Sequence, residues 1–396
     1  MEYDFDEIID RRNTDSVKYD LAEKSGKPAD VLPLWVADMD FRTAPGIIER
    51  LSADAKFGIY GYTEGGEDYF RAVSGWYRER FGWHVEKEWL VRTPGVVFAI
   101  NIAVRALTEE GDAVMIQQPV YYPFSAAVRN NERKLINNGL MLRDGHYEID
   151  FDDFENKIAE NNVKLFILCS PHNPVGRVWT LEELRRIGEI CLAHGVKVVS
   201  DEIHSDFVYE GYKHHVFTTV DPAFEAISIV CTAPSKTFNL AGLQVSNIFI
   251  PDQQMREAFE KQMQLIGYGG INLIGLHACQ AAYETGQAWL EELKVYLRGN
   301  LDYVREYLNK NLPVIRLIEP EGTYLIWLDC RGLGLSEEDL EHLIVQEAKL
   351  WLDAGAMFGT DGEGFERINI ACPRSVLAEA MERLKRAVDA RQTLTQ

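Results

Sequence analysis

SKTFNLAG, residues 235–242, follows closely on the β-branched run ISIVCT, residues 227–232. This order predicts that Lys236 lies just beyond a buried strand, on a bend rather than on a solvated helix face. Burial removes water from the ammonium group, so the neutral, nucleophilic amine becomes accessible near neutral pH. Such an amine suits a covalent bond with an aldehyde cofactor. A lysine beside a serine is more often a surface charge, so the hypothesis depends on the residues upstream.

Polar residues also follow two other predicted strands. SPHNP (170–174) comes after a strand predicted at 163–169, and DEIH (201–204) after one at 196–200. Alternation of such strands with helices, one of them opened by the capping box Thr180-Leu181-Glu182-Glu183, predicts an α/β fold whose sheet is mostly parallel and covered by helices on both faces. Ligands collect at the carboxyl ends of strands in such sheets. We therefore expect Asn173, Asp201 and Lys236 to converge.

A glycine turn adds a further signal. TPG (93–95) connects a strand predicted at 89–92 to an apolar helix predicted at 96–107. Free amide groups at a helix start form a ready cradle for phosphate. An ordinary strand-to-helix turn would give the same pattern.

The length of 396 residues favours a large domain with a smaller one. The character of the chain changes near residue 285, where long helices and a new group of strands begin. We expect an N-terminal arm at 1–45, a large domain at 46–285 and a smaller C-terminal α/β domain at 286–396. Residues 34–41, LWVADMDF, predict a short strand in the arm, which should pack on the small domain.

Composition excludes several functions. The formal net charge of −21 repels phosphate backbones and anionic membranes, so no nucleic-acid partner is expected. The chain contains no run of about 18 apolar residues, and its acidic start differs from a signal peptide. Six cysteines lie far apart with no C-x-x-C pair, which favours a reducing compartment. The prediction is a cytoplasmic protein with no membrane contact.

Taken together, these motifs resemble the fold-type I pyridoxal-phosphate enzymes of the class I/II aminotransferase superfamily. The resemblance spans almost the whole chain. It is closest to the C–S lyase, or cystalysin-like cystathionine β-lyase, subgroup, through stretches at 35–41, 61–65, 170–177, 201–206 and 234–244. It implies an aspartate-aminotransferase-like large domain and pyridoxal 5'-phosphate as the cofactor.

The resemblance implies a catalytic set of Lys236, Asp201 and Tyr121. Lys236 matches the lysine that bonds to the cofactor aldehyde and moves the Cα proton. Asp201 matches the carboxylate that keeps the pyridine nitrogen protonated, although an isolated Asp there often caps a helix. Tyr121 matches the aromatic residue stacked on the ring. Asn173 matches the partner of the cofactor 3-oxygen, although Asn-Pro alone indicates only a turn.

Phosphate binding is assigned by the same resemblance to Gly95, Val96 and Ser235. Tyr62 matches a tyrosine that reaches the phosphate of the neighbouring subunit, which implies a homodimer with shared sites; Tyr60 is the rival. His204 stands where many relatives carry a tyrosine beside the 3-oxygen.

The expected partner is a small-molecule amino-acid substrate, and the implied substrate-binding set is Arg367, Tyr62 and Asn173. Arg367 matches the arginine that binds the substrate carboxylate, since a planar fork fits that group. Arg374 is the fallback.

Two positions depart from the common pattern, and one alternative chemistry is open. Gln244 stands where a basic residue usually neutralises the phosphate, and Ala233 replaces a frequent serine. Gln244 also occurs in the lyase subgroup. A metal site at Asp201-Glu202-x-His204 is the alternative chemistry, but adjacent strand residues point to opposite faces, so no metal is predicted.

The resemblance implies β-elimination: cleavage of cystathionine or related cysteine S-conjugates to a thiol (homocysteine), pyruvate and ammonia. An aminotransferase is the main alternative, which a second cation for a dicarboxylate side chain would favour; Arg92 and Arg177 are candidates. A cofactor-bound protein that regulates a partner is the second alternative.

Overall fold

A seven-stranded sheet forms the centre of the computed structural model, which describes residues 3–394. Neighbouring strands are parallel except β10, which is antiparallel to both its neighbours. The mostly parallel sheet predicted from the sequence is thus confirmed. In spatial order the strands are β2 (Leu90–Thr93), β10 (Ser246–Phe249), β9 (Ser228–Thr232), β8 (Lys197–Asp201), β7 (Leu165–Cys169), β3 (Ala113–Ile116) and β4 (Lys134–Asn137).

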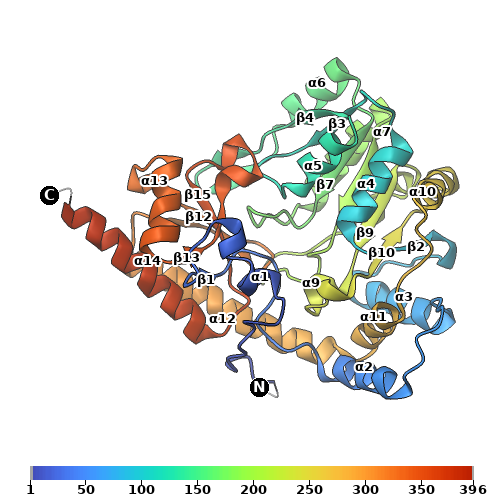
Figure 1. The fold of residues 1–396 in the computed structure, drawn as a ribbon. Helices are drawn as coiled ribbons and strands as arrows, with labels where there is room; N and C mark the ends of the chain where they lie inside the picture. The colour runs from blue at the N-terminus through green and yellow to red at the C-terminus, as the bar shows by residue number, and fades with distance from the viewer. Residues whose placement is uncertain (1–2, 395–396) are drawn as a thin grey trace.

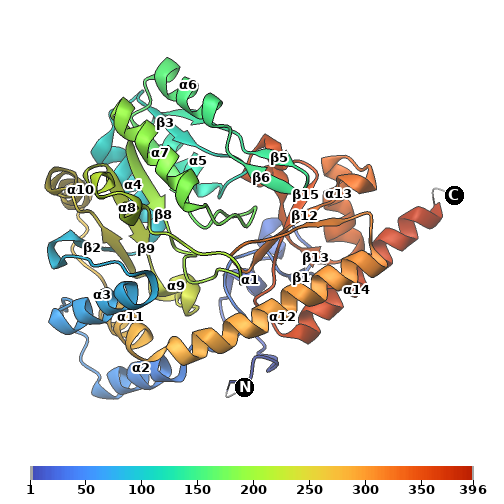
Figure 2. The same ribbon diagram turned by 180° about the vertical axis from the view of Figure 1, so that it is seen from behind.

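Helices cover both faces of this sheet, as Figures 1 and 2 show from opposite sides. Successive side chains of β7 alternate between the two faces, so Leu165 and Ile167 pack into one core cluster and Phe166 and Leu168 into the other. The first cluster includes α4 (Val96–Leu107), α5 (Pro123–Asn130) and α10 (Gln253–Leu265); the second includes α6 (Phe151–Asn161), α7 (Leu181–His194) and α8 (Phe217–Val220).

Several smaller elements complete this part of the chain. The helix α11 (Leu273–Thr285) packs against α2 (Pro45–Phe57) and α3 (Glu67–Phe81). A two-stranded hairpin is formed by β5 (Met141–Arg143) and β6 (His146–Glu148). The capping box at Thr180 is present, with both reciprocal hydrogen bonds to Glu183.

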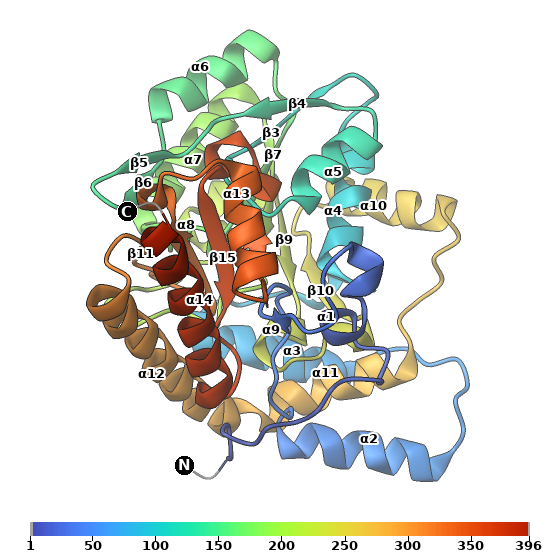
Figure 3. The ribbon, with the colours of Figure 1, turned by 60° about the vertical axis from the view of Figure 1, so that its left-hand side comes forward.

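The C-terminal part has an antiparallel sheet of its own. Its strands, in spatial order, are β11 (Arg316–Ile318), β12 (Leu325–Asp329), β15 (Phe365–Asn369) and β14 (Asp353–Ala354). The helices α12 (Gln287–Asn311) and α14 (Arg374–Leu394) lie side by side against it, and α13 (Glu337–His342) lies near β15 (Figures 2 and 3). Although α12 has 25 residues, no helix within residues 3–394 is both long and apolar enough to cross a bilayer.

The N-terminal segment joins this C-terminal part through a short parallel ladder. Following α1 (Val17–Asp20), β1 (Leu32–Pro33) pairs with β13 (Leu350–Trp351). The rings of Trp35 and Trp351 stack at 4.4 Å between centroids beside the ladder. The division of the chain at residues 45 and 285 stays a prediction, with which this pairing is compatible.

The strand predicted at residues 34–41 is wrong, because side-chain amides bind the backbone of this segment. Asn239 accepts from the Met39 N–H and donates to the Met39 and Phe41 carbonyls. Asn369 donates to the Val36 and Asp38 carbonyls. These bonds satisfy the Met39 N–H and four carbonyls of residues 36–41 without a β-ladder.

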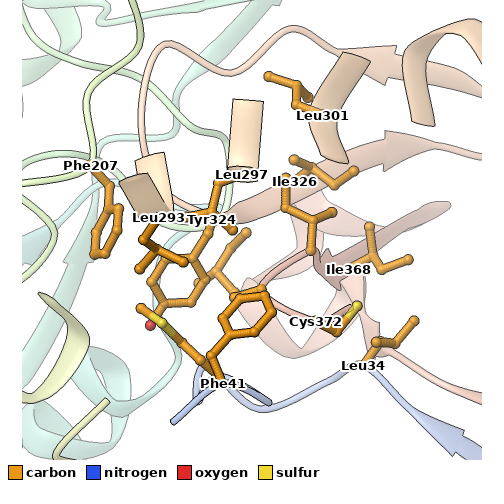
Figure 4. Close-up of a cluster of buried hydrophobic side chains, with 14 of the residues drawn as sticks. Leu34, Phe41, Phe207, Leu293, Leu297, Leu301, Tyr324, Ile326, Ile368 and Cys372 are labelled. Atoms are coloured by element: carbon orange, nitrogen blue, oxygen red, sulfur yellow. The ribbon is translucent and has the colours of Figure 1, made fainter. Parts of the chain in front are cut away.

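A buried apolar cluster connects the N-terminal segment, α12 and the small sheet (Figure 4). Leu34 and Phe41 come from the segment, Leu293 and Leu297 from α12, and Ile326 from β12. Burial of this kind stabilises a fold in proportion to the apolar area removed from water.

We expect Leu293→Ala to lower the free energy of unfolding by about 2–5 kcal/mol, since it leaves a cavity in this cluster. Val295→Ala is the matched control on the same helix, because Val295 is 67% exposed and should change stability by about 0.5 kcal/mol or less. Urea unfolding followed by circular dichroism measures both. Equal effects of the two changes would contradict the assigned orientation of α12.

Candidate active site

A cavity of about 180 Å³ opens at the carboxyl ends of the central strands. Asn173 follows β7, Asp201 ends β8 and Lys236 follows β9, and all three line the cavity. The structure therefore brings together most of the residues singled out in the sequence, which are Gly95, Val96, Tyr121, Asn173, Asp201, His204, Ser235 and Lys236.

Lys236 lies on the one-turn helix α9 (Pro234–Thr237) rather than on the expected bend. The proline at its start has the fixed φ that a first helical residue needs. The next residue anchors the turn, since Thr237 donates to the buried Asp206 at 2.7 Å. The Lys236 ammonium group donates to the Ala37 carbonyl at 2.7 Å.

Burial, and after it the nearby Arg367 charge, lowers the pKa of Lys236 to about 8. The carboxylates of Asp38 and Asp201 oppose this effect. A substantial fraction of Lys236 is thus neutral and nucleophilic at a pH near 8.

Asp201 is the carboxylate of the cavity. Burial raises its pKa to about 7, while the Ile203 N–H and the Lys236 charge act in the opposite direction. A cationic ring nitrogen against this carboxylate would lower its pKa again, as any close opposite charge does.

Glu202, the next residue, faces away from the cavity. Its carboxylate accepts from Ser200 at 2.8 Å and lies 2.8 Å from His214 Nε2. Across residues 3–394 no group of three His, Cys, Asp or Glu side chains is arranged to hold a metal ion.

Three neutral side chains surround these charges. Burial holds the pKa of His204 well below its ordinary value, so the imidazole is neutral, and its buried Nδ1 has no hydrogen-bond partner. The backbone N–H of Tyr121 donates to the Asn173 carbonyl at 3.0 Å, which ties these two residues together. Desolvation also raises the pKa of the Tyr121 phenol, so the ring stays neutral.

An anion cradle forms one side of the cavity. Gly95 is the N-cap of α4, and a Cβ atom placed on it would meet nothing within 4 Å. The first amide groups of a helix have no partner within it, so those that begin at Val96 are available to a phosphate. Ser235 and Gln244 also line the cavity.

The cradle lacks a permanent positive charge of its own. Of the residues in the described part of the chain that line the cavity, Lys236 is the only lysine or arginine. Because Gln244 is uncharged and stands where a basic residue is usual, a phosphate here would be bound by neutral hydrogen-bond donors. The unpaired His204 nitrogen, the open space at Gly95, the amine and the carboxylate together fit a cofactor with an aldehyde, a ring nitrogen and a phosphate.

Arg367 reaches the edge of the cavity through Asn173. Its guanidinium donates to Asn173 Oδ1 at 3.0 Å, to the Trp35 carbonyl at 2.7 Å and to Asp353. The guanidinium also lies over the Phe358 ring, 5.0 Å from its centroid.

The other candidate arginines lie elsewhere. Arg374, at the start of α14, donates to Asn300 on α12 and does not line the cavity, and its fallback role stays a prediction. Arg177 is buried between Glu183 and Glu321. Arg92 donates to the Gly65 carbonyl and lies near the Glu64 carboxylate.

Tyr62 and Tyr60 do not reach the cavity of their own chain. Both are exposed, and Tyr62 is fully so. They line a separate, wide surface groove of about 1650 Å³ together with Arg92 and Tyr268. Their predicted role at a neighbouring subunit stays a prediction.

Sequence reasoning missed several cavity residues. Ala37 contributes a backbone carbonyl, which no sequence motif encodes, and Tyr324 Oη donates to the same carbonyl at 3.2 Å. Cys169, Ile203 and Ser246 line the cavity beside residues that were singled out. Their positions at strand ends were the available signal.

A large doubly covered sheet with a buried amine, a carboxylate and an anion cradle at its strand ends defines a cofactor-dependent α/β enzyme class. The sequence model of the family "Aminotransferase class I and II" matches residues 29–384. The chain belongs to this family.

Individual relatives agree over nearly the full length. The protein named cystathionine beta-lyase PatB of Bacillus subtilis is 44% identical over 384 residues, which cover 97% of this chain and 99% of that one. The crystal structure of cystalysin from Treponema denticola, described as containing pyridoxal 5'-phosphate, has a TM-score of 0.95 at 40% identity. It covers 98% of this chain and 100% of its own.

A third relative carries a different description. The crystal structure of a pyridoxal-phosphate-bound putative aminotransferase from Clostridium difficile has a TM-score of 0.96 at 46% identity. It covers the same shares of the two chains.

We predict that Lys236 of the cofactor-free protein reacts with a small aldehyde with a midpoint near pH 8, because only the neutral amine attacks a carbonyl. The rate should rise as pH increases through that value. Borohydride trapping followed by peptide mass spectrometry measures the modified fraction. Lys236→Ala is the control, and a midpoint above pH 10 in the native chain would contradict the effect of burial.

Proposed function

We propose that this chain is a pyridoxal-phosphate-dependent carbon–sulfur β-lyase. It cleaves cystathionine or related cysteine S-conjugates to a thiol, pyruvate and ammonia. The observation that carries the proposal is the convergence of Lys236, Asp201 and Asn173 on one cavity, in a chain 44% identical to a protein named cystathionine beta-lyase.

Lys236 is the proposed covalent and basic group. When bound, pyridoxal phosphate supplies an aldehyde that joins amines and a ring that takes up the electron pair left when a Cα proton is removed. Lys236 would hold that aldehyde through its amine, and the amine of the substrate would compete for the same aldehyde. Released Lys236 then removes the Cα proton, for which a pKa near 8 is suited. Loss of the thiolate from Cβ completes the elimination.

The remaining cavity residues hold charge and orientation. Asp201 would keep a proton at the ring nitrogen, and Tyr121 would pack against the ring. Asn173 and the neutral His204, which both line the cavity, are the proposed partners of the 3-oxygen. The α4 amide groups from Gly95 and Val96, together with the Ser235 hydroxyl, bind the phosphate.

Arg367 is the proposed partner of the substrate carboxylate, next to Asn173. A dicarboxylate side chain would need another free cation, whereas Arg177 is already paired with two carboxylates. This pairing favours thioether amino acids over the dicarboxylic substrates of many aminotransferases.

An aminotransferase is the second candidate, because a relative at 46% identity is described as a putative aminotransferase. The two reactions share removal of the Cα proton by lysine. They differ in whether a Cβ substituent leaves or a proton returns to the cofactor.

We further propose a cytoplasmic homodimer with shared sites. Tyr62 is fully exposed and does not line the cavity of its own chain, which leaves it available to the cavity of a second copy. The six cysteines are all free and buried, which suits a reducing compartment.

Purified, cofactor-loaded protein with cystathionine should release pyruvate and free thiol in equal amounts, independent of an added 2-oxo acid. Lys236→Ala should lower this rate by about a thousandfold or more, since it removes both the amine and the base. Lactate dehydrogenase coupling and a thiol reagent measure the two products. Turnover that needs the 2-oxo acid and releases no thiol would make the protein an aminotransferase.

Hybrid dimers test the shared site. We expect Lys236→Ala and Tyr62→Ala each to be impaired, and a purified hybrid of the two, co-expressed with different tags, to recover about half of the native rate, because one of its two sites is then complete. The same hybrid made with Tyr60→Ala tests the rival tyrosine. No recovery in either hybrid would contradict sharing through these residues.

A further inference from the structure

Arg367 has a buried carboxylate partner that the proposed reaction does not use. Asp353 on β14 lies directly opposite Arg367 on β15 in the antiparallel register, so the two side chains share one face. Each residue is only 2% exposed, and the Arg367 Nη2 group donates to the Asp353 carboxylate. A buried guanidinium without such a partner would be costly, so this pairing neutralises it.

The donors of Arg367 are unevenly committed. Nη2 bonds to both the Trp35 carbonyl and Asp353, which uses both of its hydrogens, and Nη1 donates to Asn173. Nε is buried and has no partner. A carboxylate bound by two parallel donors needs either the Nε and Nη2 pair or the Nη1 and Nη2 pair. Both pairs contain Nη2, which Asp353 holds in part.

We propose that Asp353 is an internal counter-ion that occupies the carboxylate-binding edge of Arg367 and competes with the substrate carboxylate for it. The inference rests on the proposed role of Arg367 in substrate binding. Asp353 acts through Arg367, so it is a positioning residue. Substrate affinity is then set by the exchange of one carboxylate for another rather than by Arg367 alone.

The charged groups around Arg367 and Asp353 should make binding of the substrate carboxylate depend on pH. An arriving carboxylate places two anions beside one buried guanidinium, which favours proton uptake. Burial already raises the pKa of Asp353, and it raises the pKa of the neighbouring Glu366 well above its ordinary value. The charged groups that act on this pair of carboxyls are Arg367, Lys27, Glu337 and Glu341. Lower pH therefore favours carboxylate binding.

The test uses 3-(methylthio)propionate, which has the carboxylate and thioether of a substrate but no amine. Isothermal titration calorimetry on the cofactor-loaded protein gives its affinity at about pH 6.5 and about pH 8.5, in two buffers that differ in ionisation enthalpy. The variants are Asp353→Asn, which keeps the shape and removes the charge, and Arg367→Lys. Asp329→Asn is the matched control, since Asp329 also pairs with an arginine on the same sheet, but that arginine is Arg331 and not Arg367.

We expect Asp353→Asn to bind the probe about tenfold more tightly than the native chain, because it removes one buried like charge. Its affinity should also lose most of its pH dependence. The native chain should bind more tightly at the lower pH and take up protons on binding. Asp329→Asn should match the native chain.

Weaker binding by Asp353→Asn would overturn the inference and leave Asp353 as a support for Arg367. Unchanged binding by Arg367→Lys would overturn the assignment of the substrate carboxylate to Arg367, and this inference with it. If Asp353→Asn fails to fold, as its melting temperature would reveal, the native chain decides. Absence of proton uptake in the two buffers then overturns the proposal.

Discussion

The hydrogen bond from the Lys236 ammonium to the Ala37 carbonyl connects the three parts of this molecule. Ala37 belongs to the N-terminal segment, Lys236 follows the central sheet, and Tyr324, which donates to the same carbonyl, precedes β12 in the C-terminal part. The amine is therefore held by contacts between segments far apart in sequence. Correct placement of the reactive group requires all three to be folded.

The geometry of that carbonyl depends on two asparagines. Asn239, from the octapeptide that contains Lys236, and Asn369, from the end of β15, bind the backbone on either side of Ala37. Buried amides bonded in this way hold an irregular segment without a sheet. Because residues 36–41 are not part of a β-sheet, their backbone can direct the Ala37 carbonyl towards Lys236.

Positive and negative side chains in and beside the cavity occur in pairs, and burial shifts the pKa values of some of them. Desolvation lowers the pKa of Lys236 to about 8 and raises that of Asp201 to about 7, so both groups can change protonation near neutral pH. Arg367 and Asp353 form a second pair, which is joined to the cavity residue Asn173 by a hydrogen bond from Arg367. Both pairs are where a proton-transfer enzyme needs adjustable groups.

Much of this arrangement could be predicted from the sequence because its signals are local. β-branched runs indicate the central strands, Thr180 and Glu183 cap a helix, and polar residues at strand ends indicate the cavity. Asp353 could not be found, because it lies on a two-residue strand with no motif and gains its meaning only from the register with Arg367. The contribution of Ala37 is a backbone atom, and the role proposed for Tyr62 depends on a second chain.

The buried arginines also limit which side chains the cavity can accept. Arg177 is fixed by Glu183 and Glu321 and lies 4.6 Å from the Trp179 ring centroid. Withdrawing it for a ligand would leave two carboxylates without a counter-ion at a cost of about 3–5 kcal/mol. The guanidinium groups of Arg177 and Arg367 thus already have anionic partners, and neither is a free cation for a second substrate carboxylate. A thioether carries no charge, so burying it costs less free energy than burying an unpaired carboxylate. This difference is the physical basis for preferring a sulfur-bearing side chain over a dicarboxylate.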